Sequence, residues 1–542
     1  MGDTGQPEPA PRSRARKPLR GHLPFAVFLA ALTAYCAYLQ VDLAGLLPRL
    51  YLVRIFFQVA LAALVVATMR NLLGIKTLGM FSVVIIALAF LATGLLLGLA
   101  LFGVILAVVM LASGALIAER VQGAHRIAIL VTIVSITIAS VVLLGVEIGQ
   151  HELFFAVLFP VLISAWMAER YVERVTRVGW DEPTETLGWT LAAIVLAFAV
   201  VTFDPLVNAI ELNPLTWPLL VFLNWLLGTR IRFRLSERYR FGGVSTYALG
   251  DHPAAGDFAD DVLTMNTRNR DYVAVYNPPA AMARLSKEGA KALLVPQGIP
   301  MARTYLVLHS ADDLAPFRTF LASHDRFVLK PGSGHGGEGI LLVHGKRDGG
   351  YETGEGLQTA KALEAHALRI LDGEYGGDQR DVALVEELLT PHPAIQDLSP
   401  IGLADIRVIS FLGYPVMAML RIPTRASGGK ANLHLGAVGA GIRLSTGTIV
   451  HCVLHGLPQP EHPDTGQSLP GARVPFWDEV LEIAAEAQHL SGLGFAGVDI
   501  AIDATRGAVV MEVNRRPGLE IQNANAAGLR RRPRAIALRA RS

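Results

Sequence analysis

Lys330 and the glycine-rich segment behind it carry the first chemical signal in the chain. The stretch Phe327-Val-Leu-Lys-Pro-Gly-Ser-Gly-His-Gly-Gly-Glu-Gly-Ile340 joins a short apolar run to a lysine and then to a glycine loop. Residues without a Cβ let backbone N–H groups approach phosphate oxygens closely, and a lysine ammonium offsets phosphate charge. No G-x-x-x-x-G-K-[ST] sequence surrounds the loop, so a P-loop is not supported. Because a glycine loop alone is more often an ordinary turn, the assignment needs a second signal.

Asp499, Glu512 and Asn514 supply that second signal. On a strand, Glu512 and Asn514 project from the same face because side chains alternate with period two, and Asp499 on a neighbouring strand could join them. Carboxylate and amide oxygens suit Mg²⁺, which binds few protein groups together with phosphates and waters. Each acid taken singly is more simply a solvated strand end. Together with Lys330, the set indicates a site for a nucleotide triphosphate on magnesium and therefore an ATP-using enzyme.

The composition divides the chain into a membrane half and a soluble half. The 542 residues are 52% hydrophobic and have a mean hydropathy of +0.41, too apolar for a wholly soluble chain. Up to about Gly228 the sequence is a series of apolar runs of roughly 18 to 22 residues, long enough to cross the hydrocarbon core as helices. We expect about eight such helices, near residues 23–40, 51–69, 78–95, 98–118, 127–147, 151–168, 188–204 and 212–229.

Lysine and arginine residues mark one side of these helices. They gather in the segments Arg12–Arg20, Arg70–Lys76, Arg120–Arg126, Arg170–Arg177 and Arg230–Arg240, whereas the opposite loops contain little beyond Arg49. By the positive-inside rule both termini are cytoplasmic and the number of spans is even. No clear small-residue cleavage site follows the first apolar run, so we expect it to stay as an anchor. Few ionisable residues lie deep in the spans, which favours an anchor over an ion pathway and leaves transport of a neutral or lipid-like substrate open.

From Phe241 onward, short β-branched and apolar runs alternate with helical stretches, as in an α+β domain. We expect strands at 301–308, 327–330, 339–343, 382–389, 406–411, 415–420, 498–502 and 508–513. Helices are expected at 285–294, 312–322, 359–371 and 476–490. The two cysteines, Cys36 and Cys452, give neither a disulfide framework nor metal-ligand spacing, which suits a reducing cytoplasm.

Several motifs of the soluble half, read together, resemble the ATP-grasp fold. They are Lys287 and Lys291 ahead of Gly298-Ile-Pro300, Lys330 with its glycine loop, Val385-Glu-Glu-Leu-Leu-Thr-Pro-His392, Asp405-Ile-Arg-Val408, and Asp499 followed by Glu512-Val-Asn514. A second set is similar to the alpha-L-glutamate ligase-like branch, which is related to the RimK-type glutamate ligases. That set is Met265-Asn-Thr-Arg-Asn-Arg-Asp-Tyr272, Asn277-Pro278, Met419-Leu-Arg-Ile-Pro-Thr-Arg-Ala-Ser427 and Lys430-Ala-Asn-Leu-His434. Residues 161–188 resemble the seven-helix membrane block found beside inactive transglutaminase-like domains, and no soluble insert of that kind is present.

The expected fold class is therefore an α-helical transmembrane bundle of about eight helices followed by an α+β ATP-grasp domain. The expected boundaries are a basic segment 1–22, a membrane domain 23–229, a basic linker 230–240, the ATP-grasp domain 241–528 and a basic tail 529–542. The tail is either solvated or lies against anionic lipid.

The resemblance implies roles for individual residues. Lys291 and Lys330 would contact the ATP phosphates, under a mobile lid formed by Ser333, Gly334, Gly336 and Gly337. His335 stands where such loops often have a small residue, which puts the detailed contacts of the lid in doubt. Glu386, Glu387 and Leu388 would form the hinge beside adenine, and Asp499, Glu512 and Asn514 would hold one or two Mg²⁺ ions. Arg421, Arg407, Lys430 and Asn432 would face the acyl phosphate or the acceptor.

The activity that the resemblance implies is ATP-dependent ligation of a carboxylate to an amine through an acylphosphate, for example of an amino acid to a peptide or envelope precursor. An ATP-grasp phosphotransferase and an ATP-binding regulatory or transport protein without ligase activity are the alternatives. The expected partners are ATP, Mg²⁺, carboxylate and amine substrates and the lipid bilayer, with no nucleic acid. The expected location is the inner membrane, with several spans and both termini cytoplasmic.

Overall fold

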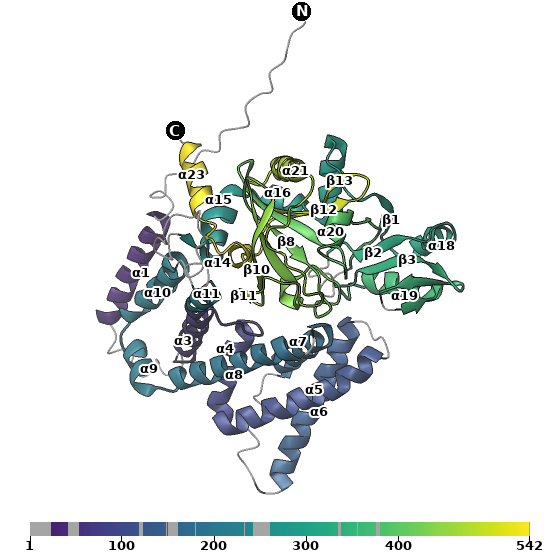
Figure 1. Ribbon diagram of the computed structural model, residues 1–542. Helices are drawn as coiled ribbons and strands as arrows, with labels where there is room; N and C mark the ends of the chain where they lie inside the picture. Colours follow the sequence, from purple (N-terminus) through teal and green to yellow (C-terminus); the bar gives the residue numbers. More distant parts are fainter. Residues whose placement is uncertain are drawn as a thin grey trace, which may run out of the picture. The chain divides into compact units, whose positions relative to one another are not determined.

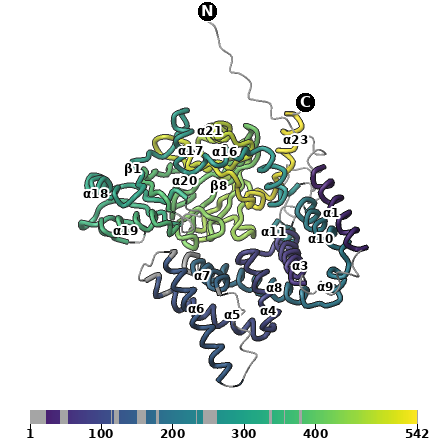
Figure 2. Tube along the Cα trace, turned by 180° about the vertical axis from the view of Figure 1, so that it is seen from behind, coloured from purple at the N-terminus to yellow at the C-terminus, as the bar shows by residue number. Residues whose placement is uncertain are grey.

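The computed structural model describes residues 23–41, 54–118, 123–147, 149, 161–178, 180–231, 234–241, 261–333, 338–354, 356–375 and 380–540. Two compact units make up the chain, Met1–Ile231 and Arg232–Ser542. The first is helical, and the second combines helices with two antiparallel sheets (Figure 1, Figure 2). The predicted order, a helical half followed by an α+β half, is confirmed.

The first unit contains α1 (Leu23–Val41), α3 (Arg54–Thr68), η2 (Met69–Leu73), α4 (Phe81–Thr93), α5 (Leu95–Ala118), α6 (Gly123–Glu147), α7 (Val161–Val178), α8 (Asp181–Val201), α9 (Asp204–Glu211) and α10 (Thr216–Arg230). Among the described residues, five helical segments are long and apolar enough to cross a membrane: α1, α3 with η2, α5, α6 and α8. A sixth results if α9 and the helix that begins at Thr216, which meet at a bend of 110°, count as one span.

The prediction of about eight spans exceeds what this part of the chain supports. The run predicted at 78–95 forms only the 13-residue helix α4, and the run at 212–229 belongs to the bent pair. The run at 151–168 begins outside the described residues. From Val161 it forms α7, which continues through Glu169 and Arg170 and is therefore amphipathic, with polar side chains over much of its length.

The exposed surface of the first unit is rich in large apolar side chains. Leu111 is 81% exposed, Leu143 69% and Phe28 56%, whereas Phe90 and Ile194 are fully buried in the core that joins the helices. Exposed apolar surface on this scale marks contact with a membrane or a partner. The bundle thus presents an apolar exterior around a packed apolar interior.

The larger sheet of the second unit has seven strands in the order β11-β10-β9-β8-β7-β12-β13. The strands are β7 (Asp405–Phe411), β8 (Tyr414–Ile422), β9 (Val438–Arg443), β10 (Thr448–Leu454), β11 (Leu457–Pro458), β12 (Phe495–Asp503) and β13 (Gly507–Asn514). The sequence predicted β7, β8, β12 and β13 but missed β9 and β10. Their Gly-Ala-Gly and Val-His-Cys stretches lack a clear alternation of apolar and polar residues.

The side-chain alternation of these strands separates a core face from a polar face. Val408, Leu420 and Val498 pack in the core beneath α21 (Trp477–Leu490). Arg407 and Asp499 each lie one residue away along the same strands, so they project from the opposite face. The register of β7, β8 and β12 therefore brings charged residues from three strands onto one side of the sheet.

The smaller sheet has six strands in the order β1-β6-β2-β3-β4-β5. They are β1 (Thr304–Leu308), β2 (Phe327–Pro331), β3 (Leu341–Arg347), β4 (Gly350–Thr353), β5 (Gly356–Gln358) and β6 (Ala383–Glu386). Leu329 and Val385 pack against α18 (Leu314–Ser323) and α19 (Ala360–Leu371) in one core. Lys330 and Glu386 alternate with them and project from the face opposite to α18 and α19.

The segments just before and just after the smaller sheet both bond to strands of the larger sheet. The backbone N–H of Val510 donates to Pro300 O at 2.8 Å, and that of His392 donates to Ile502 O at 2.9 Å. The other helical segments of the unit are α11 (Leu235–Arg240), α14 (Met265–Thr267), η4 (Arg268–Val273), α15 (Ala274–Tyr276), α16 (Pro279–Arg284), α17 (Lys287–Leu294), η5 (Val295–Gln297), η6 (Ala311–Asp313), α20 (Pro393–Gln396), η7 (Leu433–Leu435), α22 (Ile521–Ala524) and α23 (Arg531–Arg539).

Candidate functional site

Two lysines from different elements converge on one buried carboxylate. Lys291 Nζ, from α17, lies 2.7 Å from Glu386 Oε1, and Lys330 Nζ, from β2, lies 2.6 Å from Glu386 Oε2. The side chain of Glu386 is 3% exposed, and those of the lysines are 12% and 14% exposed. Burial lowers the pKa of Lys291, an effect that the Glu386 carboxylate opposes. The structure thus brings together the two lysines that the sequence singled out for phosphate.

Lys287 adds a third ammonium group to this side of the site. It lies one helical turn before Lys291 on α17, and its Nζ donates to Pro331 O at 2.9 Å. Burial is the largest cause that lowers the pKa of Lys287, and the nearby Lys330 ammonium group lowers it further. The carboxylates of Glu512 and Glu386 act in the opposite direction. Lys287 was not among the predicted site residues. Its i, i+4 spacing from Lys291 was the signal that could have identified it.

The start of the glycine loop is held by Asp381. The backbone N–H of Ser333 donates to Asp381 Oδ2 at 2.9 Å, and the N–H of Gly332 donates to Val382 O at 2.9 Å. The Ser333 amide therefore has an acceptor within the protein. The lid residues Gly334, Gly336 and Gly337 lie outside the described residues, so the predicted lid stays a prediction.

The predicted adenine hinge follows β6. The Glu387 carboxylate lies 3.0 Å from Arg506 Nη2 and accepts from the backbone N–H of Arg303 at 3.1 Å. Among the described residues no hydrogen bond engages the backbone of Leu388. The side chains of Glu386 and Glu387 are thus used within the protein, and the backbone of Leu388 is the group in this segment that remains free for a base.

A charged network lies on the polar face of the larger sheet. Asp499 accepts from Arg407 Nε at 2.7 Å and from Arg407 Nη2 at 2.6 Å, so this pair is bidentate. The same carboxylate accepts from Arg421 Nη2 at 2.8 Å and from Asn514 Nδ2 at 3.0 Å. Arg421 also forms a bidentate pair with Asp405. The structure therefore joins four predicted residues and adds Asp405, whose role the sequence did not suggest.

Burial and pairing act in opposite directions within this network. Burial acts to raise the pKa of Asp499, but the guanidinium groups of Arg407 and Arg421 outweigh it and hold that pKa below its usual range. Burial raises the pKa of Asp405 to about 6, against the opposing effect of Arg421. Desolvation raises the pKa more for the carboxylate that has fewer cationic partners. Asp499 is thus held as the anion, while Asp405 titrates closer to neutrality.

Lys430 and Asn432 lie in the loop after β8. Lys430 is exposed, and the Asn432 side chain accepts from the backbone N–H of His434 at 3.1 Å, which caps η7. The predicted positions facing the acceptor therefore divide into two groups. Arg407 and Arg421 belong to the charged network, and Lys430 and Asn432 belong to a neighbouring loop.

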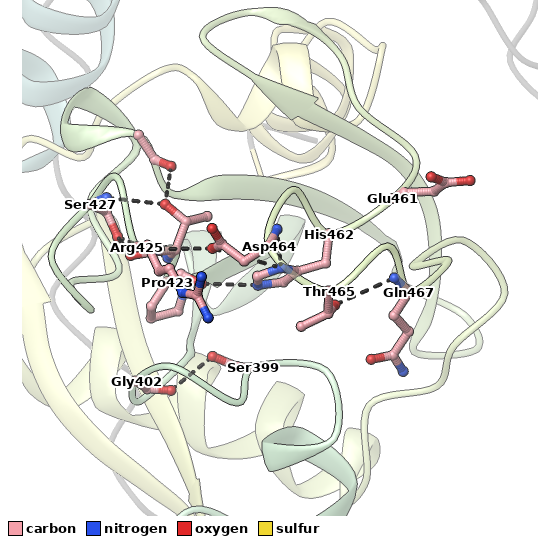
Figure 3. A network of polar contacts seen from close by, with 12 residues as sticks. Ser399, Gly402, Pro423, Arg425, Ser427, Glu461, His462, Asp464, Thr465 and Gln467 are labelled. Atoms are coloured by element: carbon pink, nitrogen blue, oxygen red, sulfur yellow. Dashed lines mark hydrogen bonds and ion pairs between the residues drawn. The ribbon is translucent and has the colours of Figure 1, made fainter.

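That loop is fixed by a buried histidine (Figure 3). His462 is 1% exposed, its Nε2 donates to Pro423 O at 3.1 Å, and its Nδ1 accepts from the backbone N–H of Asp464 at 3.2 Å. Asp464 Oδ2 accepts from the backbone N–H of Arg425 at 2.9 Å. These bonds require neutral His462 with its proton on Nε2. The segment 460–467 thereby anchors the start of the loop that carries Lys430.

Two family profiles match the chain, one in each unit. Residues 267–537 match the family described as sugar-transfer associated ATP-grasp. The chain belongs to that family. Residues 40–245 match the family described as seven transmembrane helices usually fused to an inactive transglutaminase. The protein is thus an ATP-grasp protein with a multi-pass membrane domain. The predicted alpha-L-glutamate ligase-like branch is a finer assignment than this match.

Solved ATP-grasp ligases are similar to the second unit. The ligase PsnB, in complex with its minimal precursor, is 22% identical over 49% of this chain and 64% of its own, with a TM-score of 0.27. The D-cycloserine synthetase DcsG is 17% identical over 48% and 72%, with a TM-score of 0.28. The D-alanine–D-alanine ligase from Coxiella burnetii is 13% identical over 47% and 53%, with a TM-score of 0.26. The chain spans less than two thirds of the PsnB chain, and no curated protein matches it.

The ATP-grasp family generally binds ATP with Mg²⁺, and the residues here fit the metal only in part. Asp499 and Glu512 are register partners on β12 and β13, and Asn514 is on the same strand as Glu512. However, Asp499 already accepts four hydrogen bonds, three of them at Oδ2 and one at Oδ1. Among the described residues no group of three or more His, Cys, Asp or Glu could hold a metal ion. The arginines and Asn514 thus occupy most of the Asp499 carboxylate in this arrangement and leave one lone-pair position on Oδ1, while Glu512 is the other carboxylate of the trio.

Proposed function

We propose that the ATP-grasp unit is an ATP-dependent ligase that joins a carboxylate to an amine through an acylphosphate. The observation that carries the proposal is the convergence of Lys291 and Lys330 on the single carboxylate of Glu386, with the ammonium group of Lys287 near Lys330. Two ammonium groups paired with one carboxylate leave an excess of positive charge in a mostly buried place. A triphosphate matches that excess, because its charge is spread over several oxygens.

The proposed chemistry needs positioned charge and no protein nucleophile. An oxygen of the substrate carboxylate bonds to the γ-phosphorus as the bond to the β–γ bridging oxygen breaks, and ADP leaves. The amine nitrogen then bonds to the acyl carbon, inorganic phosphate leaves with the C–O electron pair, and the amine proton passes to phosphate or solvent. Lys291 and Lys330 offset charge on the phosphoryl oxygens in the first step. Arg407 and Arg421, on the larger sheet, offset charge on the acylphosphate in the second.

The residues with nucleophilic side chains support this division of labour. The Ser427 hydroxyl donates to Thr424 O at 3.0 Å within a tight turn, and Cys452 is 2% exposed. Burial raises the pKa of Cys452 to about 12, so its thiol is protonated at neutral pH. Both side chains serve the fold, which leaves the catalytic contribution to lysines and arginines.

We also propose that both termini and the ATP-grasp unit are cytoplasmic, in the inner membrane. Three ion pairs join distant segments of the first unit: Lys76 with Glu182 at 3.2 Å, Arg126 with Glu169 at 2.8 Å, and Arg54 with Glu211 at 3.1 Å. The distribution of basic residues assigns both members of each pair to the same side, inside for the first two and outside for the third. This agreement supports the topology. Reporter fusions after residue 240 that appear outside would contradict it.

The substrates that we propose are an amino acid or short peptide and an envelope precursor. PsnB and the D-alanine–D-alanine ligase are ligases, and the family is described as sugar-transfer associated. An acceptor built on a cell-envelope glycan or peptide is in keeping with both. A cytoplasmic active site tethered to the membrane would meet such a precursor before export.

The test is to incubate the purified chain with ATP, Mg²⁺ and pools of carboxylates and amines. Ligation predicts phosphate release that depends on both substrates, and hydroxylamine in place of the amine should trap the acylphosphate as a hydroxamate. Lys330→Met should abolish both signals, and Lys346→Met, which changes an exposed lysine on β3, should not. Formation of a stable phosphoester without an amine would indicate a phosphotransferase instead. Nucleotide binding without turnover would indicate a regulatory protein.

A further inference from the structure

Three segments that are distant in sequence meet around Arg268. The Glu237 carboxylate of α11 accepts from the backbone N–H of Met265 at 2.6 Å, and Arg234 Nε donates to Asn266 Oδ1 at 3.3 Å. From the other side, Arg268 Nη1 donates to Pro517 O at 2.7 Å. Residues 234–240, 265–268 and 516–523 thus form one locality, at the end of the segment that begins with Asn514.

Arg268 is buried without a carboxylate partner. It is 8% exposed, and within the described residues its hydrogen-bond acceptors are Asn269 Oδ1 and the carbonyls of Arg516 and Pro517, all uncharged. A buried guanidinium normally has a carboxylate or another anion beside it, because desolvation of an uncompensated charge is costly. The fold therefore holds a fixed positive charge that no carboxylate contacts directly among the described residues.

Three more arginines add to that charge. Burial lowers the pKa of Arg268 to about 10, and the guanidinium groups of Arg516, Arg240 and Arg234 act in the same direction, against Glu237. The Glu237 carboxylate caps the backbone N–H groups of Arg234 and Met265, and the other acid, Glu520, pairs with Arg240. Four arginines against two glutamates leave a net charge of +2.

The reachable donors belong to Arg234 and Arg516. Arg516 is exposed, and within the described residues its guanidinium has no hydrogen-bond partner. Arg234 is half-buried and uses only Nε, so its two terminal nitrogens are free among the same residues. Guanidinium groups bind phosphate oxygens in a bidentate fashion, and a phosphate monoester carries about −1.5 to −2 charge at pH 7. Such a dianion matches the excess of +2.

We propose that Arg234, Arg240, Arg268 and Arg516 form a binding site for a phosphate group, separate from the nucleotide site. Arg268 supplies a fixed positive charge from its buried position, and Arg234 and Arg516 bind the phosphate oxygens. Two sources carry this chemistry, a free phosphorylated compound or the headgroup of a lipid. Arg234 follows α10 by only four residues in the sequence, so either source is open to it.

The test is hydrogen exchange, followed by mass spectrometry, on the full chain in nanodiscs. Peptides covering residues 234–241, 261–273 and 515–523 are compared with and without inorganic phosphate at constant ionic strength, in phosphatidylcholine nanodiscs. A second arm replaces added phosphate with phosphatidic acid in the bilayer. Protection by inorganic phosphate assigns a free source, and protection by phosphatidic acid alone assigns a lipid source. If neither arm shows protection, the proposal is overturned.

Matched variants separate this site from general screening and from the nucleotide site. Arg516→Gln and Arg234→Gln should each raise the phosphate concentration that gives half-maximal protection by about 10-fold or more, because each loses a charge-assisted hydrogen bond to phosphate. Arg515→Gln, which changes the exposed neighbour whose Nη1 bonds Met282 O, should behave as wild type. Lys330→Met should keep phosphate protection here while losing nucleotide binding, so failure of the ligase proposal leaves this one testable. Equal loss in Arg515→Gln and Arg516→Gln would overturn it.

Discussion

The shared carboxylate of Glu386 allows a sharp test of what Lys330 is for. Lys330→Met removes one ammonium group but keeps an apolar side chain of similar length. Glu386→Gln removes the carboxylate and keeps both lysines. If the lysines serve a phosphate ligand, the first change should act mainly on nucleotide affinity and the second mainly on stability.

The magnitudes follow from the contacts. In Lys330→Met, Glu386 keeps Lys291 at 2.7 Å, so the free energy of unfolding should fall by only about 1.5 kcal/mol. Loss of one charge-assisted hydrogen bond to phosphate should weaken nucleotide binding by about 10- to 100-fold. In Glu386→Gln, Lys291 keeps Ala302 O at 2.6 Å, but Lys330 loses its only described partner. A broken buried pair of this kind costs about 3 kcal/mol, while nucleotide affinity should stay at least as high as in the wild type.

The assay combines calorimetric titration with ADP and urea unfolding of the unit Arg232–Ser542. Trp477 is the only tryptophan after residue 231 and is buried, so its fluorescence reports unfolding of this unit alone. Lys346→Met is the control, because its Nζ donates to Ala322 O on the exposed side of the smaller sheet. If Lys330→Met and Glu386→Gln both changed stability and both left the ADP dissociation constant within twofold of wild type, the lysines would serve the fold and the reasoning would be wrong.

Three further predictions concern the larger sheet. Asp499→Asn should lower the free energy of unfolding by about 3–5 kcal/mol even in EDTA, because it leaves Arg407 and Arg421 without their shared carboxylate, and an effect seen only with Mg²⁺ present would refute this. The pKa of Asp405 is about 6 in the folded chain and about 4 in the unfolded chain, so the folded chain binds more protons between these two pH values. Proton binding by Asp405 therefore contributes about 3 kcal/mol to the free energy of unfolding. This contribution is complete below about pH 4 and is lost as the pH rises through about 6. Urea titrations of wild type and Asp405→Asn across that range should show the slope only in wild type, and parallel profiles would count against it. His462→Phe leaves Pro423 O and the backbone N–H of Asp464 without their hydrogen-bond partner. The free energy of unfolding should therefore fall by about 2–4 kcal/mol, and hydrogen exchange in residues 423–436 should become faster. Unchanged exchange in these residues would contradict the prediction.

The sequence by itself determined the division of the chain and most of the charged site. Apolar runs of membrane length ended near residue 228, and the structure divides the chain after Ile231. Period-two alternation placed Glu512 and Asn514 on one face, and the register pairs Asp499 with Glu512. These features are local, because hydropathy over about 20 residues and alternation along one strand need no knowledge of the rest of the fold.

The tertiary structure decided which partner each charge has. Glu386 looked like part of a hinge, and only the approach of α17 to β6 shows that its side chain bridges Lys291 and Lys330. Asp499 looked like a free metal ligand, and only the order β8-β7-β12 places Arg407 and Arg421 against it. The surroundings of Arg268 also depend on the tertiary structure. The three described segments that meet there are more than 240 residues apart from first to last, and none of them places a carboxylate against its guanidinium group. Electrostatic partners are set by strand order and helix packing, and a single sequence does not contain the sheet order from which these distances follow.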